Sequence, residues 1–489
     1  MRLDADDWAV SGGTGAGWRA VMDLRGRHAL ARVKAAAAAL ARSGPAETRR
    51  RCAEGLRRFL AKDTPERRRM LGSDPALDYW LHLRERHFAG DPATPEDWDL
   101  HYGLFAAFPL SLCWQRREKG VFEASLDPDG RLHLPGTPYS LGFGAANGRR
   151  PVKASVAPGF LTAAVAGLPV ARATRAAFEA AGPGGAAAGP ATLRRAPSAA
   201  PGLVSEHLSW LLNHGVVMHG LDHPAPAAEE KFASVIAAAL EQMAAQDPGL
   251  HAEMTELTRV VVPLRTSDTM ASVSSSYVSM RGVICLSHAD SVILQAETLI
   301  HEFCHQKMNQ LLEVDPLLEP GQGGQVFYSP WRKDARRLRG LLLGAHAFIN
   351  VASHLLKALS REGYRREESV DPMVNVALRA EQSEDALRTV AAYADLTEFG
   401  ARFTGRLWRE LMTVRHGMSW FPPALLEEAR ATHAAHRGAW ALPGTGLHRP
   451  EGFADRVGRA PFLTPGESGA VEGTPEDGAE ADAAKKEGA

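Results

Sequence analysis

The chain has 489 residues, of which 45% are hydrophobic and 23% are charged, the usual balance of a globular protein that can bury a sizeable core. Its 56 Lys and Arg residues nearly equal its 57 Asp and Glu residues, so no overall field attracts nucleic acid or an anionic membrane. The composition therefore argues against a protein that binds nucleic acid or membranes, and any partner is expected to be recognised locally.

The cysteines and the first residues bear on the compartment. Four cysteines, at positions 52, 113, 285 and 304, are widely spaced without a CxxC pair, which argues against a disulfide framework or a zinc knuckle. The chain starts without a basic segment followed by an apolar stretch, and nowhere do about 18 uncharged apolar residues run together. We therefore expect a cytoplasmic protein.

Residues 1–170 are predicted to form a mainly helical N-terminal region. The long segments 18–43 and 47–71 are rich in Ala, Arg and Leu, which favour helices, and they are interrupted by Pro and Gly, which end helices. Residues 130–170 mix Gly and Pro with short alternating runs, which favour turns and short strands.

Composition changes twice more along the chain. Residues 171–201 are rich in Ala, Gly and Pro, which predicts a flexible linker or loop. Residues 464–489 are Glu, Gly, Ala and Lys without large apolar side chains, so a disordered tail is expected. The segment between them, 202–463, is predicted to be a catalytic domain.

Within that domain, 225–256 has a helical pattern, whereas 259–264 and 277–286 are strand-like. Helices are then expected to about residue 440. The predicted fold class is α+β and mostly α-helical, with a zincin-like active-site helix next to a small antiparallel sheet.

An HExxH motif, His301-Glu302-Phe303-Cys304-His305, carries the strongest chemical signal. The helical apolar period of 291–312 places both histidines on one face, where both imidazoles can reach one metal ion. The alternative is that they are two ordinary, partly buried helix histidines.

A third protein ligand would hold the metal while leaving positions open for chemistry. His346 is one candidate, and its alternative role is a core histidine bonded to a backbone carbonyl. The remaining candidates are the weaker His354 and the carboxylates Glu381, Glu384 and Glu398.

Residues 275–348 resemble the family of HExxH-motif domains that modify ribosomally made peptides. The segments that carry the resemblance are Ser276-Tyr277, Ala296-Glu297, the motif with Gln306-Lys307, Tyr328-Ser329-Pro330-Trp331-Arg332, Arg336, Arg339-Gly340 and His346-Ala347-Phe348. This family is similar to iron(II)- and 2-oxoglutarate-dependent peptide β-hydroxylases, and the likeness covers about 75 of the 489 residues.

The resemblance implies iron(II) held by His301, His305 and His346, with a precursor peptide as substrate. Three protein ligands leave three octahedral positions, enough for the keto acid of 2-oxoglutarate and for dioxygen. The far carboxylate of 2-oxoglutarate then needs a cationic partner, for which Arg339, Arg336 and Arg332 are the candidates. Glu302 would orient a water or a ligand histidine.

Two further interpretations stay open. A zinc metallopeptidase would use Glu302 as general base and a downstream Glu or His as third ligand. The nearby acidic residues Glu313, Asp315 and Glu319, however, lie in or beside a Pro- and Gly-rich loop. A non-catalytic helical protein that binds a peptide is the other possibility, and the oligomeric state is not indicated.

Overall fold

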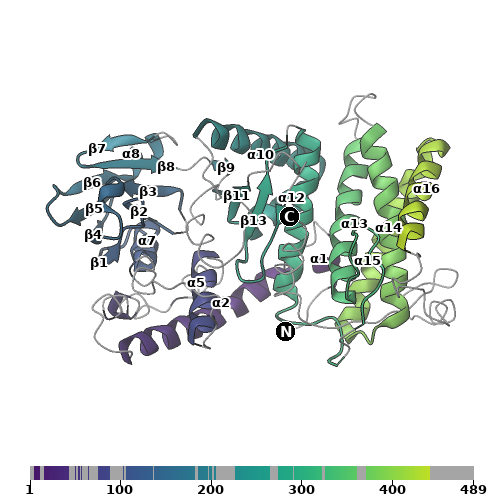
Figure 1. Cartoon of the computed structure of the whole chain (residues 1–489), viewed down its shortest axis with the longest axis horizontal. Helices are drawn as coiled ribbons and strands as arrows, with labels where there is room; N and C mark the ends of the chain where they lie inside the picture. The colour runs from purple at the N-terminus through teal and green to yellow at the C-terminus, as the bar shows by residue number, and fades with distance from the viewer. Residues whose placement is uncertain are drawn as a thin grey trace. The chain divides into compact units, whose positions relative to one another are not determined.

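The structure is a computed structural model of the whole chain (Figure 1). It describes residues 5–10, 16–42, 75–88, 106–135, 137–181, 185–195, 198–200, 203–204, 226–264, 274–289, 291–321, 325–360 and 370–440, with the isolated positions 50, 53–55, 57, 64 and 103. The expected tail at 464–489 lies outside the described residues.

The chain divides into two compact units. Unit 1 comprises Met1–Val21, Ala239–Met254 and Ala296–Ala489, and unit 2 comprises Met22–Ala238 and Thr255–Gln295. The expected division into an N-terminal region and a catalytic domain therefore differs from the observed one, because unit 1 draws on both ends of the chain.

Unit 2 contains two antiparallel four-stranded sheets, ordered β1-β4-β5-β6 and β2-β3-β8-β7. Alternate side chains along β4 and β5 are buried, so each strand turns one face toward the core. Their strands are β1 Gly120–Ser125, β2 Arg131–His133, β3 Tyr139–Gly142, β4 Pro151–Ala157, β5 Phe160–Val165, β6 Ala171–Thr174, β7 Ala186–Ala188 and β8 Ala191–Arg195. The helices around them are α2 Ala16–Arg42, α5 Pro75–Phe88, α7 Ala107–Gln115 and α8 Arg175–Ala180.

The prediction of a linker at 171–201 is wrong. Strand β6 pairs with β5, and β8 pairs with both β3 and β7. The short helix α8 begins with a cap, since the Thr174 hydroxyl accepts a hydrogen bond from the amide of Ala177 at 3.0 Å. Phe178 and Leu193 are buried, so a few large side chains anchor a segment whose average composition indicates flexibility.

A third sheet, ordered β12-β13-β11-β10-β9, precedes the motif helix in sequence. Its strands are β9 Ser198–Ala200, β10 Leu203–Val204, β11 Val260–Leu264, β12 Ser274–Ser275 and β13 Val283–Ser287. The two strands predicted here, β11 and β13, pair in parallel, whereas β12 pairs antiparallel with β13. The sheet is therefore mixed rather than antiparallel. All five residues of β13 are buried, as is usual for a strand with parallel pairing that is covered on both faces.

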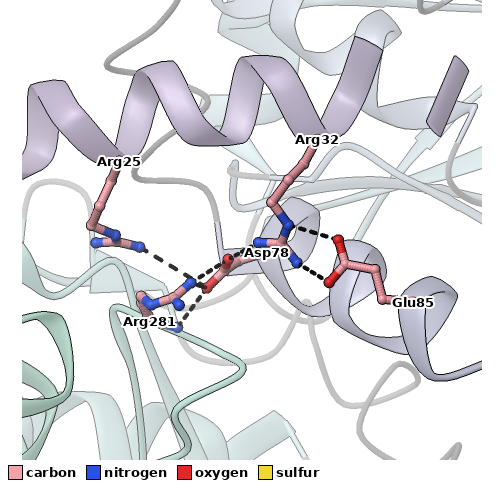
Figure 2. Close-up of polar contacts among 5 residues, drawn as sticks. All are labelled: Arg25, Arg32, Asp78, Glu85 and Arg281. Carbon is pink, nitrogen blue, oxygen red and sulfur yellow. Dashed lines mark hydrogen bonds and ion pairs between the residues drawn. The ribbon is translucent and has the colours of Figure 1, made fainter. Parts of the chain in front are cut away.

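Asp78 gathers three arginines inside unit 2 (Figure 2). Arg281 Nη1 lies 2.6 Å from one Asp78 oxygen, Arg32 Nη1 lies 3.4 Å from the other, and Arg25 Nη2 lies 4.0 Å away. Arg32 also forms a two-pronged pair with Glu85, at 2.9 and 2.8 Å. One nearly buried carboxylate, 12% exposed, therefore joins α2 and α5 to the turn before β13.

Unit 1 is built mainly from helices, in which α14 packs against α13, α15 and α16 (Figure 1). They are α1 Ala5–Ala9, α12 Val292–Leu311, α13 Leu338–Ser360, α14 Val370–Tyr393, α15 Glu398–Gly417 and α16 Pro423–Trp440, and α10 Pro226–Gln246 and α11 Pro248–Leu257 each belong partly to this unit. Among the helices described, α13 is the one long and apolar enough to cross a membrane, but 89% of its most apolar window is buried. It is the core helix of unit 1.

The α+β, mostly helical fold class predicted from the sequence is confirmed. The predicted motif helix is α12, whose bounds match the apolar period of 291–312.

Candidate metal centre

The motif histidines lie on the partly open face of α12. Glu302, Phe303 and Cys304 are buried, whereas His301 and His305 are partly exposed. The Nε2 atoms of the two histidines face each other at 3.0 Å, with the ring planes 83° apart. One turn of helix therefore brings two ring nitrogens to a common point, as the spacing predicted.

The separation of these nitrogens fits two ligands of one metal ion. Nitrogens about 2.0–2.1 Å from an ion, at angles between about 90° and 109°, lie about 2.9–3.4 Å apart. Burial lowers the pKa of His301 well below its ordinary value, and the charges on His305 and Arg379 lower it further. Burial also lowers the pKa of His305. Both imidazoles are therefore neutral at neutral pH, the form that binds metals.

Two of the three residues between the histidines, Glu302 and Cys304, differ in chemistry. Glu302 is only 4% exposed, and its charge partly offsets the effect of burial on the pKa of His305. Its carboxyl therefore lies close enough to act on the histidine pair. Burial raises the pKa of the Cys304 thiol far above its usual range, so Cys304 packs as a small apolar residue.

His346 is completely buried on α13, and its Nε2 lies 3.0 Å from the carbonyl oxygen of Trp8. Burial lowers its pKa to about 3, so the ring is neutral and Nε2 donates its hydrogen to that carbonyl. This is the contact that the alternative role of a core histidine required.

The same contact is compatible with a metal ligand, because metal-binding histidines commonly donate their second ring N–H to a carbonyl. The other ring nitrogen, Nδ1, is buried and has no hydrogen-bond partner of good geometry within the described residues, although the backbone of Cys304 lies close enough to raise the pKa of the ring. However, no three or more His, Cys, Asp or Glu side chains of the described residues are grouped so that they could hold one ion. The structure therefore joins His301 with His305, and His346 as third ligand stays a prediction.

The other candidates for a third ligand have different partners. Glu381 and Glu384 both pair with Arg415, at 3.0 and 2.6 Å. Glu398 is 91% exposed. His354 is buried, and neither of its ring nitrogens forms a hydrogen bond within the described part of the chain.

The acidic loop that a metallopeptidase would draw on has a structural role. Asp315 accepts hydrogen bonds from the Thr397 hydroxyl and the Leu317 amide, both at 2.8 Å. It thereby ties this loop to the residue that caps α15.

The arginines proposed for 2-oxoglutarate lie at the start of α13 and just before it. Arg332 and Arg336 pair with opposite oxygens of Asp334, at 2.7 and 2.9 Å. Arg339 is partly exposed in the first turn of α13. The ion pairs of Arg332 and Arg336 involve no residue of the motif.

A different arginine, which sequence reasoning missed, stands beside the motif. The guanidinium of Arg379, on α14, lies 4.2 Å above the ring of Phe348. The same ring also contacts His301, with ring centroids 4.6 Å apart. No local pattern announces Arg379, because α14 follows the motif only after α13 and a further segment.

The segments that carry the family resemblance come together at Phe348. The Trp331 ring lies 5.1 Å from Phe348, and it packs so tightly on Gly344 that a Cβ there would approach Trp331 to 2.1 Å. Gln382 donates a hydrogen bond to the carbonyl of Pro330 at 2.8 Å and accepts one from Arg379 at 3.0 Å. The Ser-Pro-Trp-Arg segment and the helix around His346 thus form one wall beside the histidine pair.

Comparisons with models of protein families and with curated protein sequences give no match to this chain.

Proposed function

We propose that the chain is an iron(II)- and 2-oxoglutarate-dependent peptide β-hydroxylase that modifies a ribosomally synthesised precursor peptide in the cytoplasm. The observation that carries the proposal is the pair of neutral imidazoles, His301 and His305, whose Nε2 atoms converge at 3.0 Å. The resemblance around Trp331 and His346 supplies the choice of reaction.

In this proposal His301 and His305 bind the metal through Nε2, and His346 binds it through Nδ1. The bound iron supplies oxidative chemistry: dioxygen converts one substrate C–H bond to C–OH while 2-oxoglutarate loses carbon dioxide and becomes succinate. The hydrogen bond from His346 to Trp8 fixes which ring nitrogen is free to coordinate.

The side chains around the histidine pair would position the substrate. His301, His305, Phe348 and Trp331 are all partly exposed. Their rings offer an apolar wall against which a peptide side chain can be held, with its Cβ directed toward the histidines. Glu302 is placed to orient a water molecule or a ligand histidine.

A zinc metallopeptidase is the second candidate, and the position of Glu302 favours it. A buried carboxylate whose charge acts on His305 is where a general base for metal-bound water would be needed. The two candidates share the histidine pair but assign different work to Glu302.

Iron content and succinate formation test the proposal. Protein loaded anaerobically with iron(II) is given 2-oxoglutarate and then oxygen, and wild type is compared with His301→Ala, His346→Ala and Glu302→Gln. We expect succinate from wild type and from Glu302→Gln at a reduced rate, and none from either histidine variant.

Two results would contradict the proposal. Zinc-dependent peptide cleavage that disappears in Glu302→Gln, without any succinate from wild type, would establish the peptidase. Failure of wild type to retain any stoichiometric metal would instead favour a non-catalytic peptide-binding protein.

A further inference from the structure

Arg379 is the charged side chain that comes next to the histidine pair without belonging to the motif. Its guanidinium and the His301 imidazole both contact the ring of Phe348, at 4.2 and 4.6 Å from the ring centroid. An arginine in this place provides a fixed positive charge beside the proposed metal.

The guanidinium is held in a definite orientation. Gln382 is 6% exposed and accepts a hydrogen bond from Arg379 Nη1 at 3.0 Å, while its amide donates to the Pro330 carbonyl. The Phe348 ring supports the flat face of the guanidinium at 4.2 Å, a favourable contact between a cation and an aromatic ring. Gln382, which is itself held by the Pro330 carbonyl, and the Phe348 ring therefore fix the orientation of the guanidinium before any ligand binds.

The donors of Arg379 are only partly used. Its ion pair with Glu297 is long, at 3.5 Å. Its Nε is buried and donates no hydrogen bond within the described residues. The side chain as a whole is 23% exposed, and a guanidinium offers both charge and donors to a carboxylate.

From this arrangement we propose that Arg379, rather than Arg332, Arg336 or Arg339, binds the far carboxylate of the dicarboxylic keto acid. This inference rests on the proposed function of the same site. A five-carbon chain spans about 5 Å, and the guanidinium is no farther from the His301 ring than the 4.2 and 4.6 Å contacts through Phe348 together allow. Phe348 would then lie along the carbon chain, with one acid group at the histidines and the other at the guanidinium.

Two keto acids that differ in one group test the inference. 2-Oxopentanoate has the chain length of 2-oxoglutarate but lacks the far carboxylate. Binding of each to full-length protein, loaded with iron(II) and kept anaerobic, is measured by calorimetry without turnover. The variants are Arg379→Gln, Arg379→Lys and Arg336→Gln, with Arg388→Gln as a matched control on the same helix, where Arg388 pairs with Glu384.

We expect Arg379→Gln to weaken 2-oxoglutarate binding roughly 10- to 100-fold, the loss typical of a hydrogen bond to a charged group. The affinity for 2-oxopentanoate and the iron content should stay within about twofold, since the group removed faces neither the keto acid nor the metal. Arg379→Lys should fall between wild type and Arg379→Gln, because it keeps the charge but loses the fork. Arg388→Gln and Arg336→Gln should match wild type.

The inference is overturned if Arg379→Gln weakens both keto acids equally or neither, or if Arg336→Gln shows the selective loss instead. If wild type holds iron yet binds neither keto acid, the proposed function fails, and this inference fails with it. The two failures can be told apart, because failure of the proposed function is seen in wild type, whereas failure of the inference alone is seen only in the variants.

Discussion

The side chain of His346 and the carbonyl of Trp8 are hydrogen-bonded across 338 residues of sequence. Two further side chains bond to the next two backbone carbonyls. Asn350 donates to the carbonyl of Ala9 at 3.2 Å, and Lys307 Nζ lies 3.4 Å from the carbonyl oxygen of Val10. The last carbonyls of a helix have no partner within it. Here three buried side chains of α12 and α13 satisfy the end of α1.

Asn350→Ala should lower the free energy of unfolding by about 2 kcal/mol, because the buried carbonyl of Ala9 loses its donor. The amide also bonds to the carbonyl of His346 at 2.8 Å, so the variant loosens that residue as well. Urea unfolding measures the effect, with Ser360→Ala as control, since Ser360 bonds only within its own helix. Equal stability of the two variants would show that this cap contributes little.

Lys307→Met should destabilise unit 1 by about 3–5 kcal/mol, the usual effect of removing one partner from a buried ion pair. Lys307 is 1% exposed and lies 2.6 Å from the Glu253 carboxylate, which is 6% exposed. The double variant Lys307→Met with Glu253→Leu should recover most of the loss, because the buried charge is then gone as well. A double variant as unstable as the single one would refute this account.

Asp78→Asn should destabilise unit 2 by about 3 kcal/mol, because Arg25 and Arg281 are almost buried and lose their shared countercharge (Figure 2). Glu85→Gln is the matched control. Its carboxylate is 44% exposed, so the loss should be about 1 kcal/mol or less. Thermal unfolding followed by circular dichroism distinguishes the two, and similar losses would mean that burial of Asp78 adds nothing.

Gly344→Ala should disturb the wall beside the histidines, because the added methyl would meet the Trp331 ring at 2.1 Å. Either Trp331 or α13 must move, at a cost of about 1–3 kcal/mol. Gly438→Ala in α16 is the opposite case, since nothing lies within 4 Å of the added Cβ. There the gain in helix propensity should stabilise by about 0.5–1 kcal/mol. Tryptophan fluorescence together with unfolding curves reports both, and a neutral Gly344→Ala would disprove the tight packing.

His354 predicts a dependence of stability on pH. Burial lowers its pKa to about 4, whereas the unfolded chain takes up the proton near 6.5. Stability is therefore complete above pH 6.5 and falls between 6.5 and about 4, because the unfolded state binds more protons. From pH 7 to 5 the loss attributable to His354 should be about 2 kcal/mol, and it should be absent in His354→Leu. An unchanged pH slope in that variant would contradict the prediction.

The parts of the fold that repeat a local pattern could be predicted from the sequence. The apolar period of 291–312 matches α12, and the run predicted at 259–264 matches β11. The run predicted at 277–286 is a strand only from Val283, where β13 begins. The segment 171–201 could not be predicted in this way, because its strands depend on partners elsewhere, such as β3 and β5. A composition rich in Ala and Gly allows a linker equally well.

In the candidate site, too, the contacts within one helix could be predicted from the sequence, whereas those between distant segments could not. The spacing of His301 and His305 fixes their approach, because both lie on one helix. The neighbours of the pair come from distant segments: Arg379 from α14 and Phe348 from α13. Sequence reasoning offered Arg339, Arg336 and Arg332 from the stretch that leads into the helix of His346, and it could not see which other helix packs beside the motif.

The discontinuity of unit 1 has a consequence for synthesis on the ribosome. Its first segment, Met1–Val21, is made first, yet its partners Lys307, His346 and Asn350 emerge hundreds of residues later. Most of unit 2 is complete before any of them appears, and domains tend to fold as they emerge. The segment Met1–Val21 can therefore pack only after α12 and α13 have been made. A nascent chain halted before α13 would leave Trp8 open to proteolysis.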